Sequence, residues 1–372
     1  MSTYQRILVA LDGSECSNLG VDAAIAIAEN SDNPLIIGCH AYAAKLHEVR
    51  FGQMEPGLPP SYQTEERLNF LRNAHDDIIN AGMQQISDAY LAGLAAKSQE
   101  KGIQFAGATP EGHNYVQLLK AGQDYHANIL VLGAWGHGRV PEGTLGSVAE
   151  RILLYAKGFD VLILRRPWEI YKKTIVVGID GSNASYSALA RAVELAKKFN
   201  ARVHAVAVYD PFFHRGVFTT ITNALSEKTR ARFNFSGEIN NLHDEIIDAG
   251  LETLYQRQLD RGVALAKALG YEITTEVLAG KIYPQLHHYA ALHDAGIVVL
   301  GRFGIHAESE SLLGSNTLNL ARVVTTNLLV VEESDADLVA LPADVDTEEH
   351  LEWDADAEAI LARVPPFALR IA

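Results

Sequence analysis

The chain has 372 residues, of which 48% are hydrophobic, and this is enough for two domains with a core each. The formal net charge of −15 argues against a nucleic-acid-binding surface, although ten acidic residues against two arginines in the segment 334–372 account for more than half of it. No apolar stretch is long enough to span a membrane and the N-terminus lacks a secretory pattern, so we expect a cytoplasmic protein.

Apolar runs alternate with helical patterns along the first half of the chain. A helix with Val21, Ala24, Ile25 and Ala28 on one face follows the first apolar run. The predicted strands are 6–11, 35–39, 103–106, 129–132 and 161–164, and the later helices are about 68–99, 115–125 and 147–155. Buried strands that alternate with helices predict a parallel sheet covered on both faces.

The second half repeats the first at an offset of 168 residues. Segment 7–17 recurs as 175–185, and segment 75–82 recurs as 243–250. The strands predicted in the second half are 175–179, 203–208, 274–277, 297–300 and 328–331. We therefore predict a first domain at 1–165, a linker at 166–173, a second domain at 174–333, and an acidic tail with a short helix at 334–372.

Two connections, 43–66 and 210–238, are longer than is usual in such folds. They are compatible with lids over a site or with arms that pack between the domains, and their apolar composition favours packing.

A glycine-rich loop follows the fourth predicted strand of each half. Gly133, Gly136, Gly146 and Ser147 in the first half correspond to Gly301, Gly304, Gly314 and Ser315 in the second. Glycines allow the backbone to approach a ligand closely, and the helix that opens at Gly-Ser presents free N–H groups to a phosphate. The alternative is a glycine turn that is required only by the geometry of the chain.

Polar side chains accompany this loop. Asp12 ends the first strand, where ligands bind in parallel α/β sheets, and its carboxylate could accept a hydrogen bond from an adenine amine or a ribose hydroxyl. His137 and Arg139 could add donors to a phosphate, and Ser14 could cap a helix or reach a phosphate or its metal.

The spacing Gly-x2-Gly-x9-Gly-Ser occurs twice, each time with an Asp at the end of the first strand. In this it resembles the ATP-binding branch of the universal stress protein family, over residues 4–165 and 173–333. The resemblance implies two tandem five-stranded parallel-sheet domains, Rossmann-like and similar to adenine nucleotide alpha hydrolases. It also implies ATP or AMP as ligand, with Mg²⁺ as a candidate companion, and places Ala41 and Val208 near the adenine.

The residues and the resemblance together give one set of candidate nucleotide-binding positions in each half. In the first half they are Asp12, Ser14, Ala41, Gly133, Gly136, His137, Gly138, Arg139, Gly146, Ser147 and Val148. In the second half they are Asp180, Val208, Gly301, Gly304, Gly314, Ser315 and Asn316.

The two sites are not expected to be equal. Glu308 and Glu310 in the second loop would repel a polyphosphate, which favours the first half as the better site. Against this difference, Glu142 also places a carboxylate in the first loop, and Arg302 gives the second loop a cation.

Histidine patterns outside the loops are candidates for other roles. The repeated His75 and His243 suggest the start of a long helix and a domain contact, or a shared pH-sensitive element. His287, His288 and His293 do not share a helix face, which disfavours a metal site.

The two cysteines and the remaining nucleophiles give no catalytic assignment. Cys16 near a helix N-terminus is either a redox-sensitive thiol or a small packed residue, and Cys16 and Cys39 form no disulfide framework. No Ser-His-Asp or Cys-His set is placed for nucleophilic catalysis, so we assign no catalytic residue, and slow ATP hydrolysis stays open.

The segment 351–370 reads as a short amphipathic helix with a proline stop. Its spacing Trp-x3-Ala-x3-Leu-x2-Val-Pro resembles the small helical domain at the C-terminus of the B subunit of light-independent protochlorophyllide reductase. The resemblance implies a docking module for an unknown protein partner. The alternative is a helix that packs back on one of the domains.

We therefore expect an adenine-nucleotide-binding stress-response regulator that acts as a nucleotide-responsive switch. The alternatives are an interaction or scaffold protein with vestigial sites, and a nucleotide hydrolase. In the family, dimers form through the fifth strands, so the resemblance implies an internal pseudo-dimer through 161–164 and 328–331, and a homodimer stays open.

Overall fold

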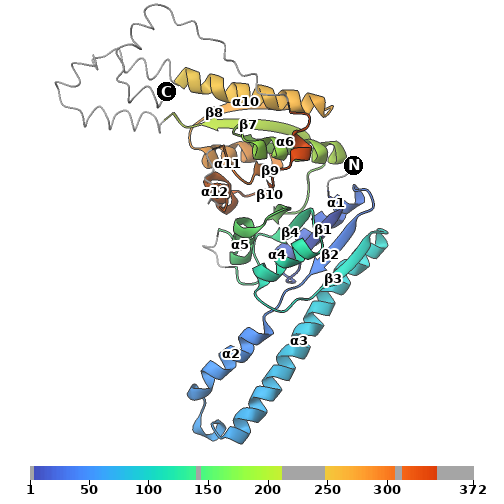
Figure 1. Cartoon of the computed structure of the whole chain (residues 1–372), viewed down its shortest axis with the longest axis vertical. Helices are drawn as coiled ribbons and strands as arrows, with labels where there is room; N and C mark the ends of the chain where they lie inside the picture. The colour runs from blue at the N-terminus through green and yellow to red at the C-terminus, as the bar shows by residue number, and fades with distance from the viewer. Residues whose placement is uncertain (1–3, 140–143, 212–247, 306–311, 342–372) are drawn as a thin grey trace, which may run out of the picture. The chain divides into compact units, whose positions relative to one another are not determined.

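The computed structural model describes residues 4–139, 144–211, 248–305 and 312–341 (Figure 1). All of them belong to one compact unit, Met1–Leu341. The predicted tail helix, with its resemblance to the reductase subunit, lies outside the described residues, as do His243, Glu142, Glu308 and Glu310.

The first half alternates strands and helices as predicted. Its strands are β1 (Arg6–Ala10), β2 (Leu35–Cys39), β3 (Gln104–Ala108), β4 (Ile129–Gly133) and β5 (Asp160–Leu164). Its helices are α1 (Glu15–Glu29), α2 (Ala44–Met54), the short 3-10 turns η1 (Glu55–Gly57) and η2 (Pro60–Tyr62), α3 (Glu65–Glu100), α4 (Asn114–Asp124) and α5 (Ser147–Tyr155).

The second half repeats this order. Its strands are β6 (Thr174–Ile179), β7 (Arg202–Tyr209), β8 (Thr274–Ala279), β9 (Ala295–Gly301) and β10 (Asn327–Val331). Its helices are α6 (Asn183–Phe199), α10 (Asp248–Ala268), α11 (Ile282–Leu292), α12 (Ser315–Val323) and α13 (Asp335–Leu338). The predicted α/β fold class is confirmed, and the ends of most predicted strands shift by one or two residues.

The strands of both halves form one continuous sheet. Its order is β3-β2-β1-β4-β5-β10-β9-β6-β7-β8. Neighbouring strands are parallel except at the centre, where β5 and β10 pair antiparallel with Leu162 opposite Leu329. The expected contact between these two strands is therefore present, and it joins the two parallel sheets edge to edge.

Two layers of helices bury the two faces of this sheet. On one face, residues of α1, α3, α6 and α10 pack against alternate strand positions such as Ile7 and Val9. On the other face, α4, α5, α11 and α12 pack against the intervening positions such as Leu8. The strands are apolar on both sides because each face is covered, which is typical of parallel sheets.

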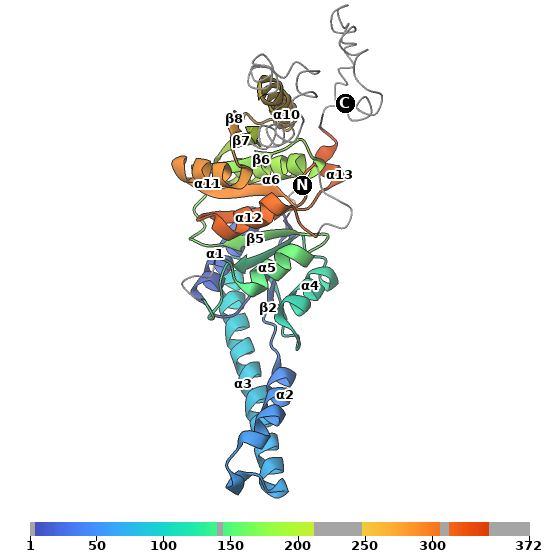
Figure 2. The same ribbon diagram turned by 90° about the vertical axis from the view of Figure 1, so that its left-hand side faces the viewer.

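The long connection 43–66 is neither a lid nor an arm between the halves. It contains α2, which lies alongside the N-terminal part of α3 in the same half (Figures 1 and 2). Phe51 of α2 stacks on His75 with ring centroids 4.6 Å apart, and Arg72 of α3 forms a bidentate pair with Glu55. Most of the other long connection, 212–238, lies outside the described residues.

The interpretation of His75 as the start of a helix is wrong. α3 begins ten residues earlier, at Glu65, so His75 lies inside the helix and serves the contact with α2. The helix predicted at about 68–99 starts three residues earlier than expected, and its N-terminal part continues beyond the part that is packed on the sheet.

A buried cluster of polar side chains also joins the two halves. Asp160 at the start of β5 accepts hydrogen bonds from the Tyr4 hydroxyl (2.6 Å) and from the backbone N–H of Glu332 (2.9 Å). Arg191 of α6 donates from Nε to Asp160 (3.3 Å) and from Nη1 to Asp337 of α13 (2.9 Å). Burial raises the pKa of Asp160 to about 6, and the charge of Arg191 opposes that rise.

We predict that Arg191→Met lowers the free energy of unfolding by about 3–5 kcal/mol, because it leaves the Asp160 carboxylate buried without its cation. The folded-state pKa of Asp160 rises further in the variant, and a raised carboxyl pKa costs stability as the pH rises from the unfolded pKa to the folded one. The loss should therefore be larger at pH 8 than at pH 5. Chemical denaturation at both pH values measures it.

The matched control is Lys97→Met, which breaks a pair between Lys97 and Asp22 whose side chains are 50% and 61% exposed. Exposed pairs contribute about 1 kcal/mol or less, so this variant should unfold much like the wild type. Equal effects of the two substitutions would contradict the stabilising role of the cluster.

Candidate functional site

The turn after β1 fixes the orientation of Asp12. Gly13 adopts a φ of 73°, which reverses the chain and lets Ser14 cap α1 by accepting a hydrogen bond from the N–H of Ser17 (3.2 Å). The N–H of Ser14 donates to Asp12 Oδ1 (2.9 Å). The second half repeats the arrangement, with Gly181 at a φ of 83° and Ser182 bound to Asp180. One carboxylate oxygen is thus used in the turn of each half.

The glycine loop after β4 lies against this turn. A Cβ on Gly133 would stand 2.6 Å from the Cβ of Cys16, and a Cβ on Gly136 would stand 2.5 Å from Asp12 Oδ2. In the second half, the corresponding distance from Gly304 to Asp180 Oδ2 is 2.7 Å. Packing within the protein therefore requires Gly133, whose neighbours include backbone atoms of Cys16 and Ser17, whereas at Gly136 and Gly304 the nearest atom is the end of an aspartate side chain.

The end of the loop opens a helix toward the same place. The N–H of Gly146 donates to Ala134 O (2.8 Å), which closes the loop and starts α5 at Ser147. α12 starts at Ser315 in the same way, with Gly314 bonded to Arg302 O (3.0 Å). The first N–H groups of each helix have no intrahelical acceptor and carry the positive end of the helix dipole, so they suit an anion.

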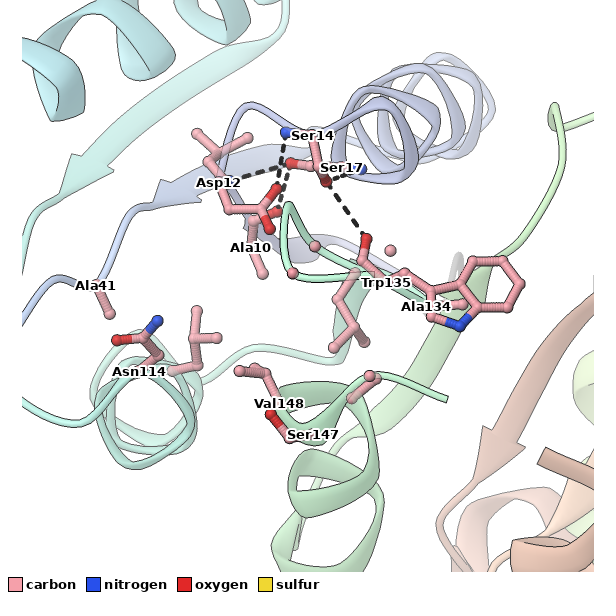
Figure 3. A pocket seen from close by; sticks show the side chains of 18 of the residues that line it. Ala10, Asp12, Ser14, Ser17, Ala41, Asn114, Ala134, Trp135, Ser147 and Val148 are labelled. Carbon is pink, nitrogen blue, oxygen red and sulfur yellow. Dashed lines mark hydrogen bonds between the residues drawn. The ribbon is translucent and has the colours of Figure 1, made fainter. Parts of the chain in front are cut away.

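These elements enclose a cavity of about 410 Å³ in the first half. Figure 3 shows Asp12 and Ser14 on one side of it, Ser147 and Val148 at the start of α5, and Ala41 beside Asn114. The predicted residues that line it are Asp12, Ser14, Ala41, Gly133, Gly136, Gly138, Arg139, Gly146, Ser147 and Val148. His137 is not among the lining residues, and its Nε2 hydrogen-bonds with the carbonyl oxygen of Asp12 (2.7 Å).

A second cavity, of about 360 Å³, lies at the corresponding place in the second half. All seven predicted positions line it, namely Asp180, Val208, Gly301, Gly304, Gly314, Ser315 and Asn316. The repeat thus brings together equivalent residues at both sites.

The expected contribution of Arg302 to the second site is wrong. Its side chain is 2% exposed and turns away from the cavity, since Nη2 donates to the carbonyl oxygens of Leu153 (2.8 Å) and Leu154 (3.0 Å) in the first half. The described lining of the second cavity contains Asp180 and no lysine or arginine. The first cavity keeps a cation, Arg139, whose guanidinium lies 4.3 Å from the ring centre of Trp135.

Several lining residues were missed by the sequence analysis. In the first cavity they include Asn114, Leu118, Trp135 and Leu145, and in the second they include Tyr255, Ile282, Leu286 and Phe303. Most of them occupy equivalent positions in the repeat, since Asn114 and Ile282, or Trp135 and Phe303, are also 168 residues apart. Their residue types carry no motif, and only the fold shows that they face a cavity.

Two arginines beside the cavities form hydrogen bonds with the opposite half. Arg165 donates to Thr144 O in the first loop (3.2 Å) and to Ala321 O near the end of α12. Arg302, in the second loop, donates to carbonyls near the end of α5, as described above, and to Leu312 O (3.3 Å). Each arginine therefore links the loop of one cavity to the helix that begins at the other cavity.

The remaining candidates give no further site among the described residues. Burial raises the pKa of the Cys16 thiol, which is the opposite of the lowered pKa that redox sensitivity requires. The described residues contain no group of three histidine, cysteine or acidic side chains arranged to hold a metal ion. No described helix is both long and apolar enough to cross a membrane.

Comparison with known proteins gives a consistent assignment. The model of the Universal stress protein family matches residues 3–165 and again residues 172–332. A universal stress protein of Methanocaldococcus jannaschii is 27% identical over 176 residues, which are 46% of this chain and 88% of the relative. The crystal structure of a universal stress protein from Archaeoglobus fulgidus covers 90% of this chain and 100% of its own, with a TM-score of 0.57 and 16% identity.

A solved universal stress protein described as a complex with cAMP matches 44% of this chain and 99% of its own, with 25% identity and a TM-score of 0.29. The two matches of the family model together cover most of the 372 residues, one match in each half of the fold.

Proposed function

The chain belongs to the universal stress protein family, and on this basis we propose that it binds an adenine nucleotide, ATP or AMP, and acts as a nucleotide-responsive regulator in a cytoplasmic stress response. The observation that carries the proposal is the convergence of a carboxylate, a glycine loop and a helix N-terminus on one cavity in each half. Both cavities have the size of ordinary small-molecule sites, roughly 300–1,000 Å³.

The first cavity offers complementary groups to each part of a nucleotide. The Asp12 carboxylate would accept from a ribose hydroxyl, and apolar walls near Ala41 and Val148 would enclose the base. The free N–H groups at the start of α5, together with the guanidinium of Arg139, would bind phosphates. These groups make the first cavity the stronger site for a polyphosphate, since the described lining of the second has no basic side chain.

The proposed Mg²⁺ would not use Ser14. Its hydroxyl already accepts from the N–H of Ser17 and lies 3.4 Å from Trp135 O, to which it donates. An ion that arrives with ATP would be held by the phosphates and by water, which suits the reluctance of Mg²⁺ to lose its hydration shell.

The regulatory part of the proposal rests on the hydrogen bonds that Arg165 and Arg302 form with the opposite half. A nucleotide that draws the first turn of α5 toward its phosphates moves a helix whose other end is bonded to Arg302 in the second loop. Conversely, α12 begins at the second cavity and its end is bonded to Arg165, which contacts the first loop. We propose that the two halves, paired as an internal pseudo-dimer through β5 and β10, respond together.

An interaction scaffold with vestigial sites is the second candidate. One observation favours it: Gly133, Gly136, Gly301 and Gly304 all stand within 3 Å, at the Cβ position, of atoms in the preceding turn or helix. Gly133 and Gly301, which face backbone atoms, would thus persist without a ligand, whereas Gly136 and Gly304 face only the ends of aspartate side chains. Gly138 is different, because nothing lies within 4 Å of its Cβ position in the loop that lines the first cavity.

We predict that Gly136→Asp abolishes tight ATP binding at the first cavity, with a loss of about a hundredfold or more. The new side chain would begin 2.5 Å from Asp12 Oδ2 and would place a second carboxylate in the loop. Isothermal titration of ATP into the wild type and the variant measures the effect, and thermal melting shows that the variant is folded.

Gly304→Asp is the matched control, since it makes the same change beside Asp180 in the second half. It should leave the tighter ATP-binding event in place, with only the smaller change in affinity that coupling between the cavities produces. Loss of that event in Gly304→Asp alone would reverse the assignment of the halves, and absence of ATP, ADP and AMP binding to the folded wild type would favour the scaffold.

We also predict that the two cavities are coupled through Arg165. With the second cavity blocked by Gly304→Asp, the ATP affinity of the first should change by roughly fivefold or more, as is typical of coupled sites. Adding Arg165→Met should reduce this effect to less than about twofold, because the contact from Thr144 to α12 is lost. Arg166→Met is the control, since Arg166 bonds to Ala295 O and to neither loop. If Gly304→Asp changed the ATP affinity of the first cavity equally in the parent, the Arg165→Met and the Arg166→Met proteins, the coupling through Arg165 would be contradicted.

A further inference from the structure

The two cavities differ at one pair of equivalent wall positions. Asn114 is the first residue of α4 and lines the first cavity, and Ile282 is the first residue of α11 and lines the second. The backbone reaches both residues by the same path, because Gly112 and Gly280 precede them with φ values of 140° and 136°. The difference between the cavities at this wall is therefore a difference of side chain.

No hydrogen bond joins the amide of Asn114 to another residue in the part of the chain that the structure describes. Asparagine often caps a helix, but the N-cap of α4 is His113, and Asn114 lies inside the first turn. Figure 3 shows the amide beside Ala41, at the wall across the cavity from Asp12 and the glycine loop.

An unused amide at this wall has a defined chemistry. A carboxamide donates and accepts at the same time, so it pairs with a partner edge that presents an acceptor next to a donor. The 6-amino group of adenine and its neighbouring ring nitrogen form such an edge, and asparagine binds adenine in this bidentate way in nucleic-acid recognition. An isoleucine at the same position contacts a base only through its apolar surface.

We propose that Asn114 is a specificity-determining residue of the first cavity, which reads the amino-bearing edge of a purine, and that Ile282 leaves the second cavity indifferent to that edge. The inference rests on the proposed nucleotide binding and deepens it. The first cavity thereby selects adenine over purines that lack the 6-amino group, while the second accepts both.

A second exchange between the halves agrees with this difference. Val148, the second residue of α5, corresponds to Asn316, the second residue of α12. Both residues line their cavities, so the second cavity carries its amide at the helix that would face the phosphates rather than at the wall where Asn114 stands. Each cavity has one amide at these two positions, and only in the first does it lie beside the strand end at Ala41.

The experiment isolates each cavity in the full chain and exchanges the two residues. A Gly304→Asp background reports the first cavity, and a Gly136→Asp background reports the second. The probes are ATP and purine riboside triphosphate, which lacks only the 6-amino group. The first cavity should prefer ATP by about tenfold, and Asn114→Ile should reduce that preference to about twofold or less, because affinity for ATP falls more than affinity for the analogue, which keeps only the ring nitrogen acceptor.

The reciprocal change, Ile282→Asn, should give the second cavity a preference for ATP that it lacks in the parent. Asn114 is exposed, so its replacement leaves the core intact, and thermal melting checks this. Equal loss of both nucleotides in Asn114→Ile, or an unchanged preference, would overturn the role of Asn114 while nucleotide binding stands. Failure of the Gly304→Asp protein to bind either nucleotide would instead overturn the proposed function, and this inference with it.

Discussion

The antiparallel pairing of β5 with β10 determines the arrangement of everything else in the molecule. It joins the two parallel sheets side by side with their strands running in opposite directions. The carboxyl ends of the strands therefore point in opposite directions in the two halves. Each cavity lies beyond the carboxyl ends of the strands of its own half. α5 starts at the first cavity and runs back along the sheet, and its end therefore reaches the edge where the second loop lies. The crossed contacts of Arg165 and Arg302 follow from this geometry.

The glycine loops combine two requirements. The loop must pass close to the turn after the first strand and to the start of α1, where backbone atoms of Cys16 and Ser17 exclude a side chain at Gly133. It must also end where a helix begins, so that Gly146 and Ser147 place free N–H groups at the cavity. A ligand site is thus formed from backbone that the fold already constrains. Differences between the halves arise from the side chains around it, such as Arg139 and Asn114 in the first half.

Much of the fold could be predicted because the apolar runs and the glycine motifs of the first half recur in the second half. The offset of 168 residues located the strands of both halves, and Asp12 and Asp180 marked the strand ends where the cavities lie. α2 was missed because it packs mainly on the N-terminal part of α3 and has a weak apolar pattern. Arg302 was assigned to a ligand because its position in the loop is visible in the sequence, whereas its acceptors, at the end of α5, are set by the strand pairing.

A crystal structure of the full chain grown with ATP tests the central claim most directly. The account predicts nucleotide in the first cavity, with the base beside Ala41 and Asn114, the ribose at Asp12, and the phosphates at the first turn of α5. The same crystal should show weaker or no triphosphate in the second cavity. An empty first cavity at saturating ATP, or a nucleotide bound with its phosphates away from Ser147 and Arg139, would contradict the account.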